Sequence, residues 1–121
     1  MNIIFSISIT TAWVILAATQ PGCKKLDVPK DTPACIKKEI KRIQSENVWS
    51  PPASVWQYEY NGQTVYYISA HAGDIPSELY DSNCNHICSP DGGFVGNGDG
   101  KCPDFMSKRT NPKLIWQDER K

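Results

Sequence analysis

Apolar and polar residues alternate through two runs between Val55 and Ile68, and the dipeptide Asn61-Gly62 separates the runs. Aromatic and β-branched residues are frequent in both runs, which is typical of strands. Asn-Gly suits a type I′ turn, and a two-residue turn sets the register of the hairpin around it. The pattern therefore predicts a hairpin. Its register pairs Tyr60 with Gln63, Tyr58 with Val65 and Trp56 with Tyr67.

One face of this hairpin is predicted to be the more apolar, and we expect it to pack against a helix. This face carries Trp56, Tyr58, Val65 and Tyr67. The opposite face carries Gln57, Glu59, Thr64 and Tyr66, with Val55 and Ile68 at its far end. An aromatic strip can also stack on nucleobases or sugars. No basic residue lies among these positions, so packing in a core is favoured.

Three isoleucines spaced at i, i+4 and i+7 predict an amphipathic helix before the hairpin. They are Ile36, Ile40 and Ile43. A residue that precedes proline is pushed out of the α region, so Thr32 is expected as the N-cap and Pro33 as the first helical residue. Pro51 and Pro52 then separate the helix from the hairpin.

Two shorter strands are expected after the hairpin, at residues 77–81 and 86–88, with a turn at 82–85 between them. A loop that holds five of the eight glycines follows. The predicted fold class is α+β: one N-terminal helix packed on a small antiparallel β-meander of about four strands, with a disulfide-tied Gly-rich loop.

The length of 121 residues allows a single domain. The predicted organisation is a signal peptide at 1–22, a tether at 23–32, one α+β domain at 33–105 and a polar C-terminal tail at 106–121. In the tail, only residues 114–116 are apolar enough to dock. The formal net charge is zero, so nothing in the composition points to nucleic acid as a partner.

An uncharged, largely apolar run covers residues 3–19, and Gln20-Pro21-Gly22-Cys23 follows it at once. The run is marginal in length for a membrane-spanning helix and is typical of a signal peptide. A small residue directly before Cys23 resembles a bacterial lipobox, in which the cysteine is lipidated and becomes the new N-terminus. This interpretation gives the protein a membrane contact through its N-terminal lipid. The alternative is a secreted protein without a lipid, in which Cys23 is an additional cysteine with no disulfide partner.

The number of cysteines agrees with lipidation of Cys23. The chain has five cysteines, and an odd number leaves one without a disulfide partner in an exported protein. Without Cys23 an even set remains, for which we expect the pairs Cys88–Cys102 and Cys35–Cys84. A direct bond from Cys84 to Cys88 would be strained by their short separation. The bond from Cys88 to Cys102 closes the Gly-rich loop, which stabilises the fold by about 3 kcal/mol in the chain-entropy description. Disulfides indicate a location outside the cytoplasm.

Three motifs in the chain are distinctive. They are Pro-Pro-Ala-Ser-Val-Trp-Gln-Tyr-Glu-Tyr-Asn-Gly at 51–62, Pro-Asp-Gly-Gly at 90–93 and Gly-Asp-Gly-Lys-Cys-Pro-Asp-Phe at 98–105. In these motifs the chain resembles a small family of uncharacterised exported bacterial proteins, often lipoproteins. The resemblance covers residues 35–105 and implies an export route and a domain, but no activity. The helix-and-meander outline is also similar to periplasmic inhibitor-like α+β proteins, which is an analogy of fold alone.

We expect no required cofactor, and calcium is the one candidate, because the Gly-rich loop carries oxygen donors. The predicted ligands are Asp91, Asn97, Asp99 and Asp104. The alternative is that Asp-Gly and Asn-Gly serve only as turn sequences. A zinc site would use Cys84, His86, Cys88 and Cys102, but this spacing is not that of a zinc knuckle and disulfides compete for the thiols.

The sequence contains no Gly-x-Ser-x-Gly motif, and its two histidines, His71 and His86, fall in or beside predicted turns. We therefore expect no enzymatic activity. The expected protein is an exported, lipid-anchored binding or structural module that contacts an envelope protein or ligand. The alternatives are a small calcium-binding domain that uses the acidic Gly-rich loop, and a secreted inhibitor-like protein.

Overall fold

The computed structural model describes residues 26–72 and 74–121. Along the chain its elements are α1 (Ala34–Gln44), β1 (Ser54–Tyr60), β2 (Gln63–Ile68), β3 (Glu78–Asp81), β4 (His86–Cys88), α2 (Phe105–Lys108) and β5 (Thr110–Gln117). The predicted signal peptide at 1–22 and the predicted lipidation site Cys23 lie outside the described residues.

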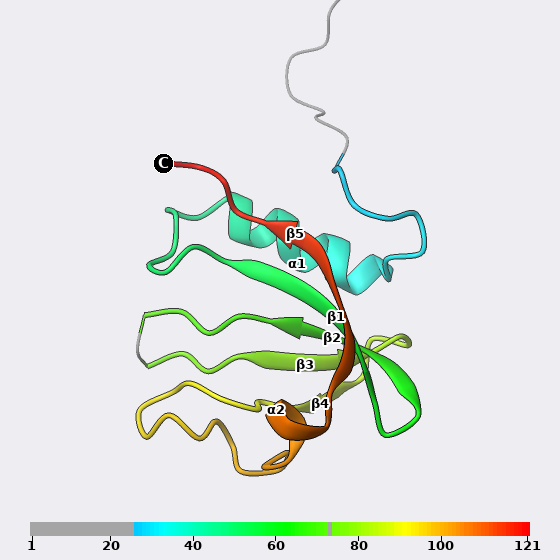
Figure 1. The fold of residues 1–121 in the computed structure, drawn as a ribbon. Helices are drawn as coiled ribbons and strands as arrows, with labels where there is room; N and C mark the ends of the chain where they lie inside the picture. The colour runs from blue at the N-terminus through cyan, green and yellow to red at the C-terminus, as the bar shows by residue number, and fades with distance from the viewer. Residues whose placement is uncertain (1–25, 73) are drawn as a thin grey trace, which may run out of the picture.

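A five-stranded antiparallel sheet forms the body of the domain, with the strand order β4-β3-β2-β1-β5 (Figure 1). Strands β1 to β4 are the predicted meander, so the α+β class and the order of these four strands are confirmed. The fifth strand and the short helix α2 correct the expectation of a polar tail at 106–121. β5 returns to pair with β1 as an edge strand, and its first five residues are all exposed.

The central hairpin has the predicted register, with Tyr58 opposite Val65 and Trp56 opposite Tyr67. Both turn residues adopt positive φ, 50° at Asn61 and 77° at Gly62. This is the backbone of a type I′ turn, which asparagine and glycine tolerate better than other residues. The turn chemistry therefore set the pairing of β1 with β2.

The prediction of which hairpin face meets α1 is wrong. Val55, Tyr66 and Ile68 share a buried cluster with the three isoleucines of α1. All three strand residues lie on the face that was expected to be the more polar one. The helix covers the apolar end of that face. At the other end, near the turn, Thr64 donates a hydrogen bond to Glu59 at 3.1 Å, so these two polar side chains satisfy each other.

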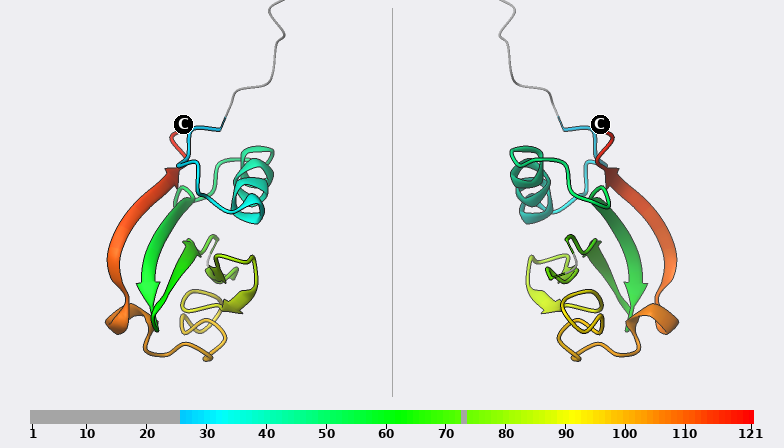
Figure 2. Two further views of the ribbon diagram at one scale, coloured as in Figure 1. Left: turned by 90° about the vertical axis from the view of Figure 1, so that its right-hand side faces the viewer. Right: turned by 90° about the vertical axis from the view of Figure 1, so that its left-hand side faces the viewer.

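The face predicted for the helix is covered by the Gly-rich loop and α2. Tyr58, Val65 and Leu79 pack there against Phe105 and the Cys88–Cys102 disulfide. The ring of Phe105 meets that of Tyr58 edge-on, with 5.7 Å between centroids. Both faces of the sheet are thus buried by different parts of the chain. Figure 2 shows α1 at one end of the molecule and the Gly-rich loop with α2 at the other.

Helix α1 begins one residue later than predicted. Pro33 is the N-cap, with φ −57° and ψ 147°, and the first helical residue is Ala34. Thr32 instead closes a turn in which its N–H donates to the Pro29 carbonyl at 3.0 Å. The Thr32 hydroxyl is buried and finds no hydrogen-bond partner within residues 26–72 and 74–121, so it does not cap the helix.

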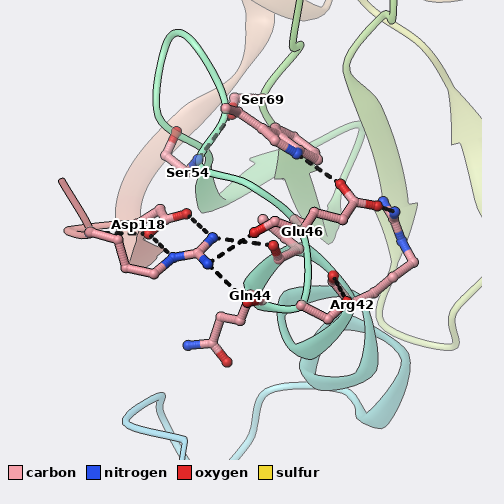
Figure 3. Close-up of polar contacts among 10 residues, drawn as sticks. Arg42, Gln44, Glu46, Ser54, Ser69 and Asp118 are labelled. Carbon is pink, nitrogen blue, oxygen red and sulfur yellow. Dashed lines mark hydrogen bonds and ion pairs between the residues drawn. The ribbon is translucent and has the colours of Figure 1, made fainter.

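The residues after β5 fasten the C-terminus to the end of α1. Figure 3 shows Asp118 beside Gln44 there. Arg120 donates to the Gln44 carbonyl at 2.8 Å and to the Ile43 carbonyl at 3.2 Å, and its Nη2 also pairs with Asp118 at 2.7 Å. The last carbonyls of a helix have no partner within the helix. Arg120 therefore acts as a C-terminal cap from a distant part of the chain.

Candidate functional site

The Gly-rich loop is held to the sheet by a buried disulfide. Cys88, at the end of β4, is bonded to Cys102, and their exposed fractions are 0% and 7%. Cys35, in the first turn of α1, is bonded to Cys84 in the β3–β4 turn. Both pairs are those expected from the sequence. Two disulfides are typical of proteins in an oxidising, extracytoplasmic environment.

Asp91 holds the start of the loop to β2 and to the residue that precedes β3. Its Oδ1 accepts a hydrogen bond from the Tyr67 hydroxyl at 2.8 Å and another from the Ser77 hydroxyl. The Ser77 N–H donates to the Asp91 carbonyl at 3.0 Å, so backbone and side chain are both engaged. Burial and the nearby carboxylate raise the pKa of Tyr67, which keeps its hydroxyl a donor at all ordinary pH values.

Asp99 and Asp104 fasten the far side of the loop. The Asp99 carboxylate accepts from the backbone N–H groups of Lys101 and Ser89, each at 3.0 Å, and these bonds lower its pKa. Asp104 accepts from the Tyr60 hydroxyl and pairs with Lys108 at 3.0 Å, which lowers its pKa as well. These aspartates are therefore ionised structural acceptors within the domain.

The predicted calcium ligands are each engaged by other groups of the protein. Among the described residues, no group of three or more His, Cys, Asp or Glu side chains is placed to hold a metal ion. Asp91, Asp99 and Asp104 each bind separate protein donors, and Asn97 bridges back to Gly92 through its backbone. The alternative zinc set is also unavailable as thiolates, because its cysteines are in disulfides.

Two large apolar side chains project from this fastened loop. Phe94 is 94% exposed and Val95 is 80% exposed. The neighbouring β2–β3 loop carries Ile75, which is 48% exposed. The two loops lie side by side, since a Cβ on Gly93 would come within 3.7 Å of the Pro76 side chain. Ile75, Phe94 and Val95 are called the apolar tip below.

The apolar tip was not predicted from the sequence, in which acids and glycines are the most distinctive residues of the loop. A signal was present: a phenylalanine and a valine stand together between glycines, outside any periodic element. Such a pair has no strand or helix face through which to reach a core. Only the fold shows that it remains in solvent.

A second distinctive region lies beside the other disulfide. A cleft of about 310 Å³ is lined by Cys35, Ile36, Lys38, Glu39, Arg42 and Tyr80. Glu39 and Arg42 form an ion pair within it. The predicted turn histidines lie elsewhere: His71 stacks on Trp49, with 4.0 Å between centroids, and His86 pairs with Glu78.

A family match covers residues 41–118, from the last turn of α1 to the residue after β5. The chain belongs to the family described as a domain of unknown function, DUF6970. The expectation of an uncharacterised domain family is thereby confirmed. The DUF6970 region contains the sheet, the apolar tip and β5, whereas Cys35 precedes it. Neither curated proteins nor solved structures give a significant match. In the described part of the chain, no helix has the length and apolar character needed to cross a membrane.

Proposed function

We propose that this domain is a non-enzymatic binding module of the cell envelope and that the apolar tip is its contact surface. The observation that carries the proposal is the exposure of Phe94 and Val95, at 94% and 80%, on a loop fastened at both ends. Exposed apolar patches on soluble domains mark interaction sites more often than chance placement. A buried aromatic anchor commonly supplies much of the energy of an interface.

The fastening of the loop favours binding. A disulfide and the hydrogen bonds of Asp91 and Asp99 restrict the backbone on either side of the tip. A loop that is already ordered loses less conformational entropy when a partner binds it. The partner surface that fits such a tip is a shallow apolar pocket on an envelope protein.

We further propose that a lipid on Cys23 holds the module at a membrane. The described chain starts at the α1 end of the molecule, opposite the Gly-rich loop (Figures 1 and 2). An anchor at that end would direct the apolar tip away from its own membrane and toward a partner. Mass spectrometry of membrane-extracted protein should find an acylated N-terminus at Cys23. An unmodified mature chain that begins elsewhere contradicts the anchor but not the contact surface.

Site-specific photo-crosslinking in the native envelope tests the contact surface. A benzophenone amino acid is placed at position 94, and at position 106 as the control, because Met106 is an apolar side chain that is also exposed, at 39%. We expect a discrete crosslinked product from position 94 only. Added wild-type protein, or a Met106→Ser variant, should reduce the amount of this product by competing for the partner.

A Phe94→Ser/Val95→Ser double variant should not compete. Equal crosslinking from both positions, or equal competition by the double variant, contradicts the proposal. Loss of the product on treatment with EDTA would favour the calcium-dependent alternative instead, since a contact made by apolar side chains needs no ion.

A further inference from the structure

The two disulfides have different surroundings. Cys88 and Cys102 are buried beneath the Gly-rich loop. Cys84 is exposed in the β3–β4 turn, and Cys35 is half-buried at the start of α1. Cys84 also adopts φ 67°, in the left-handed region that residues with a side chain disfavour. The Cys84 half of this disulfide is therefore the one that faces solvent.

A cleft lies beside the Cys35 half of this bond, on the side of the sulfur that leaves. It is lined by Cys35 itself, by Tyr80 of β3 and by three charged residues of α1, Lys38, Glu39 and Arg42. Glu39 and Arg42 neutralise each other in an ion pair, so Lys38 supplies the uncompensated charge. Lys38 lies three residues after Cys35 and hence on the same helix face.

The position of Cys35 favours it as a leaving group. It is in the first turn of an 11-residue helix that has no acidic residue in that turn. The N–H groups and dipole at a helix N-terminus stabilise a thiolate, and a nearby lysine adds to the effect. The thiol of lower pKa leaves faster in disulfide exchange.

We propose that Cys35–Cys84 is a redox-active disulfide that exchanges with an external protein dithiol, while Cys88–Cys102 is structural. A thiolate of the dithiol attacks Sγ of Cys84, forming a mixed disulfide and breaking the bond to Cys35, which leaves as a thiolate. The second thiolate of the dithiol then attacks the first sulfur of the same dithiol, which is bonded to Sγ of Cys84. This step closes the disulfide of the dithiol and releases Cys84 as a thiolate. Two electrons pass to the domain, the dithiol is oxidised to a disulfide, and the two released thiolates take up protons.

The fold survives this exchange because other contacts hold α1. Ile36, Ile40 and Ile43 are at most 1% exposed and remain packed on β1 and β2. The exchange site lies at the α1 end of the molecule, away from the Gly-rich loop. The proposal is therefore independent of the apolar tip and of its partner.

Native-state reduction tests the selectivity. Oxidised protein is treated with dithiothreitol without denaturant, quenched at intervals with an alkylating reagent and mapped by mass spectrometry. We expect Cys35 and Cys84 to be alkylated at least about tenfold sooner than Cys88 and Cys102, because each 1.4 kcal/mol needed to expose a buried bond slows its reduction tenfold. Equal rates, or earlier reduction of Cys88–Cys102, overturn the proposal.

Reduced glutathione tests which sulfur is attacked, because a monothiol stops at the mixed disulfide. We expect glutathione on Cys84 and an alkylatable thiol at Cys35, and glutathione mainly on Cys35 contradicts the assigned direction. Lys38→Gln should slow the exchange several-fold. The matched control Lys37→Gln removes a charge of the same sign that does not line the cleft, and it should leave the rate unchanged; equal slowing by both variants excludes a specific role for Lys38.

Discussion

Gly98 lies closer to Ser89 than any residue with a side chain could. A Cβ at this position would stand 1.8 Å from the Ser89 carbonyl oxygen, and the backbone has φ +60°. We expect Gly98→Ala to lower the free energy of unfolding by the left-handed penalty of about 1–2 kcal/mol and by an overpacking cost of about 1–3 kcal/mol more. Denaturant unfolding measures the sum.

Gly96 is the matched control, because it also has positive φ, +88°, but a Cβ there would meet no atom within 4 Å. Gly96→Ala should show only the left-handed penalty, about 1–2 kcal/mol. If the two variants are equally destabilised, the Gly-rich loop is not packed against Ser89 in solution.

At the scale of the element, β5 decides whether residues 110–117 belong to the domain. Ile115 is 5% exposed and lies in the cluster shared with α1, whereas its neighbour Leu114 is 43% exposed. Ile115→Ala should reduce the free energy of unfolding by about 2–5 kcal/mol, while Leu114→Ala should change it by about 0.5 kcal/mol. Similar small effects in chemical denaturation would show that β5 is not packed on the core.

At the scale of the whole molecule, four aspartates link stability to pH. Their pKa values are lowered by hydrogen bonds from the Asn85 backbone to Asp81, from the Lys101 backbone to Asp99, from Tyr60 to Asp104 and from Arg120 to Asp118. The folded domain therefore binds protons less tightly than the unfolded chain, in which aspartate titrates near pH 3.9. Their stabilisation is complete above about pH 5 and is lost as the pH falls below about 4 toward the folded pKa values.

Thermal unfolding across this range measures the linkage. The midpoint should be level from about pH 5 to 7 and fall steeply below about pH 4. Asp104→Asn should lower the unfolding midpoint between about pH 5 and 7, because Tyr60 and Lys108 then lose their charged acceptor. The fall of the midpoint below about pH 4 should also become less steep. Asp74→Asn, on an exposed loop, is the control and should leave both parts unchanged. An acid limb that Asp104→Asn does not alter would mean that other groups govern it.

Local chemistry in the sequence was sufficient for the parts of this protein that are decided by neighbouring residues. Asn61-Gly62 determined the hairpin register, and the spacing of Ile36, Ile40 and Ile43 determined the buried side of α1. The glycine content between Cys88 and Cys102 pointed to the disulfide that closes that loop, which in turn left Cys35 for Cys84. Each of these depends on turn geometry, helix periodicity or loop closure, which act over short stretches of chain.

Only the tertiary structure decided the features that depend on what the rest of the chain leaves uncovered. Each face of the hairpin is apolar in part, so which one meets α1 depends on where the Gly-rich loop and Phe105 settle. β5 gains its stability from pairing with β1 and from one buried isoleucine. Neither feature gives residues 110–117 a sequence pattern that predicts a strand. Phe94 and Val95 would count as core residues by composition. They stay in solvent because the disulfide and the aspartate hydrogen bonds hold the loop where no other element of residues 26–72 and 74–121 covers its tip.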